Sequence, residues 1–331
     1  MRFRGHRIVK TAIAVLLTAL ICEWIGWPSV FAVITAIVTL EPTVSDSIKK
    51  GIVRFPASAI GSFYAVLFMY LFGNSPLTYT LATTLTIISC YKLKLYDGLL
   101  VATITAVAMI EVIYDDYLLS FFIRLGTTTI GLSVSTLVNL LIFPPDFMTE
   151  IERNLQNAYK HIGHTLFSMS KGNPSSVEKQ MGKLNVSISK TEELIRYEIS
   201  DAKYLKLEET KLHSLEQAEK RLEQLRFIQY HLTNLQPIHL DETNFSSENK
   251  QTIYDALEGL ANFITGNSKD MPFHHGEKLQ AIMDMYWTNA FHHEAAKRTG
   301  LPQELVFLYE LISIFYLVEH LTMGHEAQFH R

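Results

Sequence analysis

The hydrophobic and polar positions divide this chain into two halves. From Ile8 to Phe143 apolar blocks follow one another with short polar breaks, whereas from Asp146 onward apolar residues recur at spacings of three and four. A helix needs about 20 mainly apolar residues to cross a bilayer, and spacings of three and four are typical of amphipathic helices. The sequence therefore predicts an all-α protein with a transmembrane domain over residues 1–145 and a helical domain over residues 146–331.

Six transmembrane spans are predicted in the first half. The first could be mistaken for a signal peptide, but it lacks a small-residue cleavage site and further spans follow at once, so we expect it to be retained. The second is interrupted by Glu41 and Pro42. Because proline cannot donate the helical hydrogen bond, the pattern predicts either a broken helix or a helix end there. The spans cover residues 8–26, 28–44, 52–73, 77–91, 95–114 and 118–143.

Basic residues occupy alternate connections between these spans. They lie before the first span, between the second and third (Lys49, Lys50 and Arg54) and between the fourth and fifth (Lys92 and Lys94), and the other connections contain none. Cytoplasmic loops are enriched in lysine and arginine. Both ends of the transmembrane domain are therefore predicted to face the cytoplasm, and the second half, with a formal charge of −7, is predicted to lie there as well.

Residues 27–75 align without a gap on residues 97–145, at an offset of 70. Together with the predicted span that precedes it (8–26 and 77–91), each copy forms a repeat of three spans, an odd number, so the two repeats must be inverted relative to one another. Inverted repeats recur in transporters, with the substrate site near the interface of the repeats. The pairs include Thr35 with Thr105, Glu41 with Glu111, Arg54 with Arg124, Ser58 with Thr128, and Gly61 with Gly131.

Charged side chains within these segments are the candidate chemistry. Each costs about 2.5–3.5 kcal/mol at the centre of a membrane helix. On the functional interpretation Arg54 and Arg124 bind an anionic substrate, because guanidinium groups pair bidentately with carboxylates. Glu41 and Glu111 then act as gates or proton-linked groups. On the structural interpretation Glu41 pairs with Arg54 or a lysine at the membrane surface, and Glu111 is paired likewise on the other side.

Composition excludes several classes of function. A net charge of −4 without a dense field of lysine and arginine argues against a nucleic-acid binder. The only two cysteines, Cys22 and Cys90, lie in apolar blocks, which excludes a disulfide framework and a cysteine zinc site. Twelve of the thirteen histidines lie in the second half, but no metalloprotease, Walker or nucleophile-elbow motif is present. We expect no metal, no cofactor and no enzymatic activity.

The second half predicts a series of amphipathic helices. One of them has apolar residues near heptad spacing, which predicts packing on a partner helix, either within this domain or across a dimer. The segment Leu305–Val318 is too short for a seventh span and contains Glu310, so we expect a buried helix there. The heptad positions are Leu212, Leu215, Leu222, Leu225, Ile228, Leu232 and Leu235.

Several motifs in the first half carry a family resemblance. They are Trp27-Pro28-Ser-Val-Phe-Ala-Val-Ile-Thr, Pro42 after the second span, Lys49-Lys50-Gly51-x-x-Arg54 leading into Ile60-Gly61, and Arg124-Leu-Gly-Thr-x-x-Ile-Gly131 before Pro144-Pro145. With them the chain resembles the aromatic acid exporter and fusaric-acid-resistance group, and is similar to its bacterial subfamily with six spans before a helical C-terminal domain. Where the usual pattern has Gly-Thr after the first arginine, this chain has Pro56-Ala57.

The resemblance implies a homodimeric, multi-pass transporter of the bacterial plasma membrane that exports small organic, aromatic carboxylates. Arg54, Arg124, Glu41, Glu111, Thr35 and Thr105 are the predicted permeation path, with Trp27 and Phe31 offering ring contacts. Proton coupling would use Glu41 or Glu111. Two alternatives stay open, a passive organic-anion channel and a non-transporting sensor or scaffold that acts through its cytoplasmic domain. Arginines on a polar path would favour transport, and arginines sealed in salt bridges would favour a scaffold.

Overall fold

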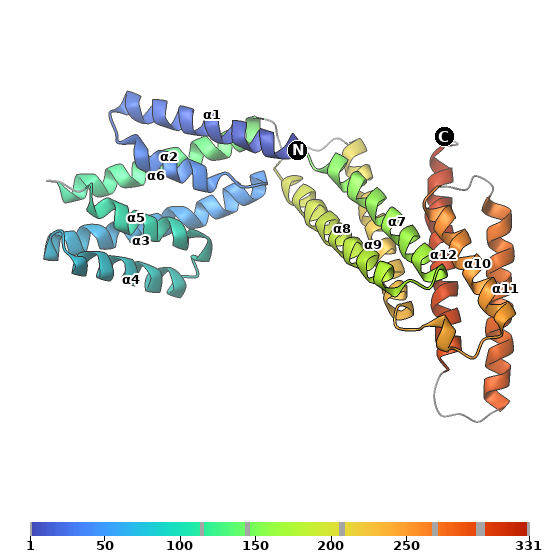
Figure 1. Ribbon diagram of the computed structural model, residues 1–331. Helices are drawn as coiled ribbons and strands as arrows, with labels where there is room; N and C mark the ends of the chain where they lie inside the picture. The colour runs from blue at the N-terminus through green and yellow to red at the C-terminus, as the bar shows by residue number, and fades with distance from the viewer. Residues whose placement is uncertain are drawn as a thin grey trace. The chain divides into compact units, whose positions relative to one another are not determined.

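The computed structural model describes residues 2–112, 116–142, 146–204, 209–266, 271–295 and 302–329, and this part of the chain is helical without a strand, which confirms the predicted all-α class. The chain forms two compact units (Figure 1). The first contains Met1–Asp146 with Ser200–Lys206, and the second contains Phe147–Ile199 with Leu207–Arg331.

The first unit holds six α-helices and one short 3-10 helix. Three of them, α1, α3 and α6, contain segments long and apolar enough to cross a membrane (7–25, 44–72 and 117–141). At 1.5 Å per residue, α2 and α5 are only about 16–18 Å long, against about 30 Å of hydrocarbon. The helices are α1 (Arg2–Ile25), α2 (Ser29–Thr39), α3 (Val44–Phe72), α4 (Pro76–Lys92), η1 (Tyr96–Gly98), α5 (Leu99–Ile110) and α6 (Tyr117–Leu141).

The boundary between the predicted second and third spans differs from the prediction. α2 ends at Thr39 rather than continuing to residue 44, and α3 begins at Val44 rather than at residue 52. Leu40 is extended, Pro42 cannot donate a helical hydrogen bond, and the Thr43 hydroxyl caps α3 by accepting from the Asp46 N–H at 3.0 Å. Glu41 therefore lies in a four-residue linker between two helices and not inside one.

The helix contacts within the first unit occur in pairs that are related by the 70-residue offset between the repeats. α3 packs on α5, α2 packs on α6, and α3 and α6 cross each other. Gly61 lies directly against the carbonyl group of Ala102, and Gly131 lies against the carbonyl group of Ala32, so the two close approaches relate residue pairs that are each 70 apart. Small residues let membrane helices approach in this way.

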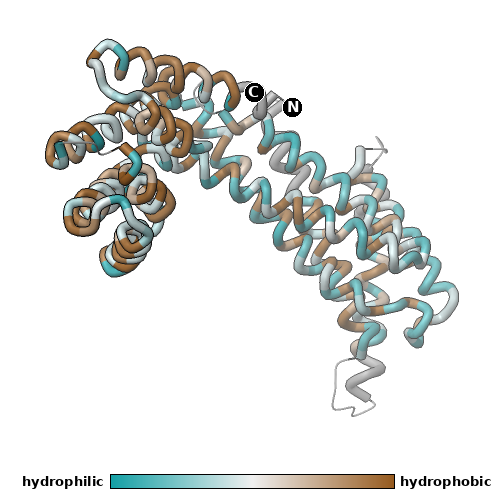
Figure 2. The backbone as a smooth tube through the Cα atoms, turned by 60° about the vertical axis from the view of Figure 1, so that its left-hand side comes forward, coloured by the Kyte–Doolittle hydropathy of each residue, from teal (hydrophilic) through white to brown (hydrophobic). Residues whose placement is uncertain are grey.

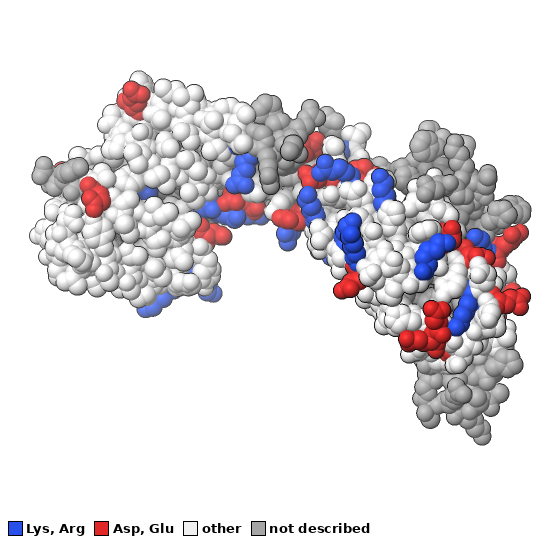
Figure 3. Space-filling view, viewed as in Figure 1, with Lys and Arg blue, Asp and Glu red and all other residues white. Residues whose placement is uncertain are grey.

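The surface of the first unit is largely apolar. Figure 2 shows its helices as mainly hydrophobic, and Figure 3 shows a surface with few charged side chains, most of the basic ones gathered toward one end. Large apolar side chains such as Leu16, Trp24 and Leu141 are exposed. An apolar exterior of this extent is typical of a surface in contact with lipid.

The second unit packs its helices around a single hydrophobic core. Six of the seven heptad residues of α9 are buried in this core, and Leu212 is 46% exposed, so the seam packs within the chain. In α12 the carboxylate of Glu310 is buried and accepts from the His231 ring and, at 2.9 Å, from Asn234. The helices are α7 (Met148–Ser170), α8 (Pro174–Asp201), α9 (Glu209–Leu235), η2 (Leu240–Glu242), α10 (Ser247–Ile264), α11 (Met271–Ala295) and α12 (Gln303–Phe329).

Candidate functional site

A buried polar layer marks the crossing of α3 and α6. The hydroxyl of Ser58 lies 3.2 Å from that of Thr128 and 3.3 Å from that of Thr105 on α5, and all three residues are fully buried. Each candidate arginine lies four residues before this layer on its own helix, Arg54 on α3 and Arg124 on α6. Each is therefore about 6 Å along its helix from the crossing.

Arg54 is fully paired. Its Nη2 donates to the Glu41 carboxylate at 2.6 Å, and the other carboxylate oxygen accepts from Lys50 at 3.0 Å. Its Nε and Nη1 donate to the carbonyl oxygens of Asp97 and Val38, each at 3.2 Å. Glu41 and two backbone carbonyl groups therefore hold the guanidinium group, and Glu41, Lys50 and Arg54 form an ionic triad, as the structural interpretation predicts for Glu41.

Arg124 occupies the corresponding place in the second repeat but lacks such partners. It is 3% exposed; its Nη2 donates to the Thr105 hydroxyl, and its guanidinium carbon lies 4.5 Å from the centre of the Phe31 ring. Its Nε and Nη1 have no hydrogen-bond partner in the described part of the chain. Glu111, the counterpart of Glu41, instead accepts a hydrogen bond from the Tyr79 hydroxyl.

A cavity of about 130 Å³ lies beside Arg124. A buried charge without a counter-charge is strongly destabilising, by several kcal/mol. Binding of an anion in the cavity would remove this cost by supplying both the charge and the missing acceptors. The cavity is lined by Pro28, Phe31, Met109, Val112, Ser120, Ile123, Arg124 and Thr127.

The predicted site residues therefore fall into separate groups. Phe31, Thr105 and Arg124 meet in one cluster, and Glu41 and Arg54 meet in another. Thr35 is buried and donates to the carbonyl oxygen of Phe31, so its hydroxyl is satisfied within α2. Trp27 packs over Gly126, half a turn from Arg124, and Glu111 is exposed beside Tyr79.

Comparison with known proteins gives the family. A UPF0421 protein of Oceanobacillus iheyensis is 45% identical over 96% of this chain and 94% of its own length. The chain belongs to the UPF0421 family. Other UPF0421 proteins, from Bacillus cereus and Staphylococcus epidermidis, are 36% and 34% identical over 96% and 94% of the chain and over 92% and 96% of their own lengths.

Residues 2–142 of this UPF0421 chain also match the sequence profile of aromatic acid exporter family member 1, which confirms the resemblance inferred from the motifs. The match covers the whole first unit up to the end of α6. The matched family is one of exporters, and the match indicates a membrane transporter. Relatives from three bacterial genera indicate a bacterial membrane protein.

Sequence reasoning missed the residues that hold the Glu41 linker of this UPF0421 protein. Asn139 on α6 is 1% exposed; its amide nitrogen donates to the carbonyl oxygens of Glu41 (3.1 Å) and Thr43 (3.0 Å) and to the Ser47 hydroxyl (2.9 Å). Its amide oxygen accepts from Lys10 at 2.8 Å. The available signal was a single amide inside the apolar run from 137 to 141, because polar residues in membrane helices bond across helices.

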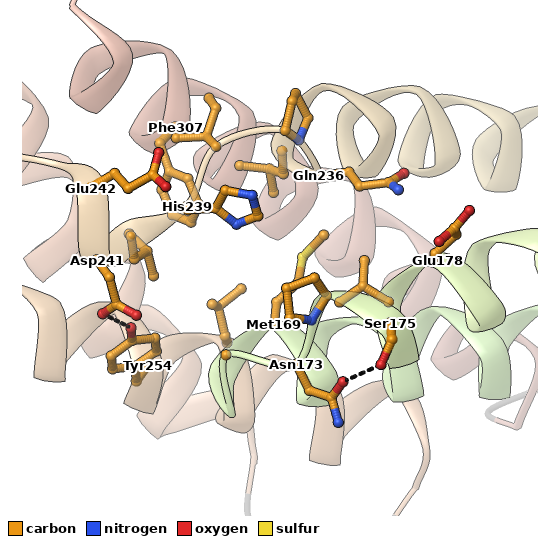
Figure 4. Close-up of a pocket in the computed structure, with 18 of the residues that line it drawn as sticks. Met169, Asn173, Ser175, Glu178, Gln236, His239, Asp241, Glu242, Tyr254 and Phe307 are labelled. Atoms are coloured by element: carbon orange, nitrogen blue, oxygen red, sulfur yellow. Dashed lines mark hydrogen bonds between the residues drawn. The ribbon is translucent and has the colours of Figure 1, made fainter.

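A larger hollow, of about 820 Å³, lies in the second unit of the UPF0421 chain (Figure 4). Its floor is apolar and includes Leu257 and Phe307, and its rim is polar. The Tyr254 hydroxyl donates to Asp241 at 3.4 Å on one side. Among the described residues that line it there is no lysine or arginine, and the described side chains form no cluster of three or more metal ligands anywhere in the chain.

Proposed function

We propose that this protein is a transporter that exports small organic carboxylates, and that Arg124 binds the carboxylate group. One observation carries the proposal: a buried guanidinium group faces a cavity, and two of its nitrogens have no partner among the residues that the structure describes. Thr105 holds Nη2, whereas no described residue offers an acceptor to Nε or Nη1, so the guanidinium group is fixed at one end and can bind a ligand at the other. A carboxylate fits such a fork bidentately.

The size and lining of the cavity support an aromatic substrate with a single ring. An apolar cavity of about 150 Å³ holds benzene in a protein interior, and the cavity beside Arg124 has about 130 Å³. Phe31 and Met109 supply apolar contact, and Ser120 supplies a hydroxyl group at the wall. Aromatic rings gain from edge or offset contact with a ring such as Phe31.

An inverted repeat supplies the two ends of the proposed path. The paired approaches of Gly61 to Ala102 and of Gly131 to Ala32 support this arrangement, because a two-fold axis between the repeats would exchange them. With inverted repeats the two arginines lie on opposite sides of the α3–α6 crossing. The Glu41–Lys50–Arg54 triad then closes one end of the path while Arg124 accepts substrate at the other. Arg54 is therefore sealed in a salt bridge, as expected for a scaffold, whereas Arg124 faces a cavity, as expected for a transporter.

The remaining features of the proposal extend the same reasoning. Six spans with both termini in the cytoplasm, a cytoplasmic second unit and a homodimer in the plasma membrane follow from the charge pattern and the family resemblance. Glu111 is the better proton-linked residue, since Glu41 is held in ion pairs by Lys50 and Arg54. A carboxyl group without a cation can exchange a proton with a smaller change in its surroundings.

Proteoliposomes containing the full chain test this proposal. We expect flux of 4-hydroxybenzoate that a pH gradient drives uphill and that Arg124→Ala lowers by at least roughly tenfold, the effect of about 1.4 kcal/mol. Arg124→Lys retains the charge without the fork and should be intermediate. Lys92→Ala, which removes an exposed charge at the end of α4, is the matched control. Undiminished flux in folded Arg124→Ala would refute the assignment.

Two alternative functions give other results in the same experiment. A passive organic-anion channel would carry 4-hydroxybenzoate only down its gradient, whatever the pH difference. A sensor or scaffold would carry none, and the hollow of about 820 Å³ in the second unit is the observation that favours it. Pockets of 300–1,000 Å³ with an apolar floor and few polar groups are typical of small-molecule sites.

A further inference from the structure

The carboxylate of Asp201, at the last residue of α8, is buried against the first turn of α3. Its Oδ1 accepts from the backbone N–H of Ser45 at 2.8 Å and its Oδ2 accepts from that of Val44 at 3.2 Å. Asp201 is 2% exposed, and it belongs with the first unit although 157 residues separate it from Val44. A residue remote in sequence therefore completes the start of a transmembrane helix.

This contact satisfies a specific need of α3. The first N–H groups of a helix have no partner within the helix, and the Thr43 hydroxyl satisfies only that of Asp46. Asp201 accepts from the N–H groups of Val44 and Ser45, the first two residues of α3. A negative charge at a helix N-terminus is also favourable to the helix dipole, and Lys10 lies close enough to interact with this carboxylate.

The linker that Asp201 adjoins carries Glu41. From one side Asn139 holds the carbonyl groups of Glu41 and Thr43, and from the other Asp201 holds the N–H groups of Val44 and Ser45. The backbone is therefore fixed on both sides of Pro42. The Glu41 side chain can meet Arg54 at 2.6 Å only while its backbone keeps this position.

We propose that Asp201 is a positioning residue: it holds the start of α3 so that Glu41 stays on Arg54 and this end of the path stays closed. The inference rests on the proposed function for its meaning in transport. Loss of the Asp201 contact would free the linker and with it the Glu41–Lys50–Arg54 triad. Asp201 touches no substrate and acts through the backbone of Val44 and Ser45.

Cys90 reports on the closed end of the path, and Cys22 is an internal control. Cys90 is fully buried against Ala57 and Ala102, and Leu95 and Leu99 pack against this cluster on either side of η1. η1 includes Asp97, whose carbonyl oxygen accepts from Arg54. Release of Arg54 should therefore loosen the cover of Cys90. Cys22 is also free and fully buried but lies in α1, away from this cluster, so only general unfolding exposes both thiols.

Maleimide labelling of the full chain in liposomes, read for each cysteine by peptide mass spectrometry, tests the inference. Asp201→Ala should label Cys90 faster by roughly tenfold and leave Cys22 unchanged, and Asp201→Asn, which keeps one acceptor, should lie between. Asp46→Asn is the matched control, because it removes a charge from the same helix end without removing a bond to Val44 or Ser45. An unchanged Cys90 rate, or equal increases at both cysteines, would overturn the inference.

A double variant separates positioning from a general structural role. Glu41→Gln alone should release Arg54 and raise Cys90 labelling, and adding Asp201→Ala should then have little further effect; additive effects would overturn the proposal. The labelling needs no transport. If Cys90 responds but wild-type protein carries no 4-hydroxybenzoate, the transport proposal fails and the positioning role stands, whereas normal flux with an unresponsive Cys90 gives the reverse.

Discussion

The two glycine contacts give a quantitative test of the paired packing in the first unit. A β-carbon on Gly61 would lie closer than 3.0 Å to the carbonyl oxygen of Ala102 and 3.1 Å from its carbonyl carbon. A β-carbon on Gly131 would meet the carbonyl oxygen of Ala32 just as closely and lie 2.9 Å from the β-carbon of Thr35. In both places the obstacle is backbone, which cannot turn aside as a side chain can.

The cost of an alanine at either position follows from these contacts. The helices would have to separate by roughly 1 Å, and forced repacking of this kind costs about 1–3 kcal/mol. Alanine gains roughly 1 kcal/mol over glycine in helix propensity. Because rigid backbone places the cost in the upper part of its range, we expect a net loss of about 1–2 kcal/mol for Gly61→Ala and a similar loss for Gly131→Ala.

Gly51→Ala is the matched control because Gly51 lies in α3 with Gly61 but has open space around it. Its nearest neighbour would be a side-chain atom of Leu132 at 3.9 Å, an ordinary contact, so only the gain in helix propensity remains. Unfolding by SDS in mixed micelles, followed by circular dichroism, measures the three variants. If Gly61→Ala and Gly131→Ala are as stable as Gly51→Ala, the close backbone approaches do not exist.

Two further predictions concern the second unit. Burial lowers the pKa of His161 below its usual 6.5, so the folded state disfavours the protonated ring. The free energy of unfolding, measured with urea, should therefore fall as the pH drops below about 6.5. The fall should be smaller in His161→Gln. His231→Leu leaves the Glu310 carboxylate buried with only Asn234 and should cost about 3–5 kcal/mol, again by urea unfolding. Adding Glu310→Met should recover much of that loss, because it removes the stranded charge.

The sequence predicted most of the local structure because helix periodicity is a local property. α8 begins just after Gly172, α9 ends just before Pro237, and α10 begins after the capping Ser246, and glycine, proline and serine are residues that mark helix ends in a sequence. The sequence does not decide the structure at Glu41, since Pro42 is compatible both with a broken helix and with a helix end. The contacts of Thr43 and Asn139 decide it.

The candidate site was predictable only in part. The offset of 70 identified Arg54 and Arg124 together, but it treats them as equivalent, and their difference depends on which side chains reach them in space. Asp201 carried no signal of its function, because its partners are backbone N–H groups more than 150 residues away. Contacts of that range have no periodicity and no spacing rule from which they could be inferred.

Arg54 and Arg124 have different polar partners because the two repeats differ in sequence at positions that the structure brings close to them. The offset of 70 places Ser120 at the position of Lys50 and Met69 at the position of Asn139, so Glu111 has at these positions neither the counterpart of the lysine that shares the Glu41 carboxylate nor the counterpart of the amide that holds the Glu41 linker. The helix crossings are therefore alike in the two repeats while the polar contacts at their ends are not. At one end of the proposed path Arg54 is paired with Glu41, and at the other end Thr105 is the side chain that accepts from Arg124 among the described residues. A substrate anion at Arg124 would supply the counter-charge that Glu41 supplies at Arg54. Substrate binding should therefore be assigned to Arg124 and not to Arg54.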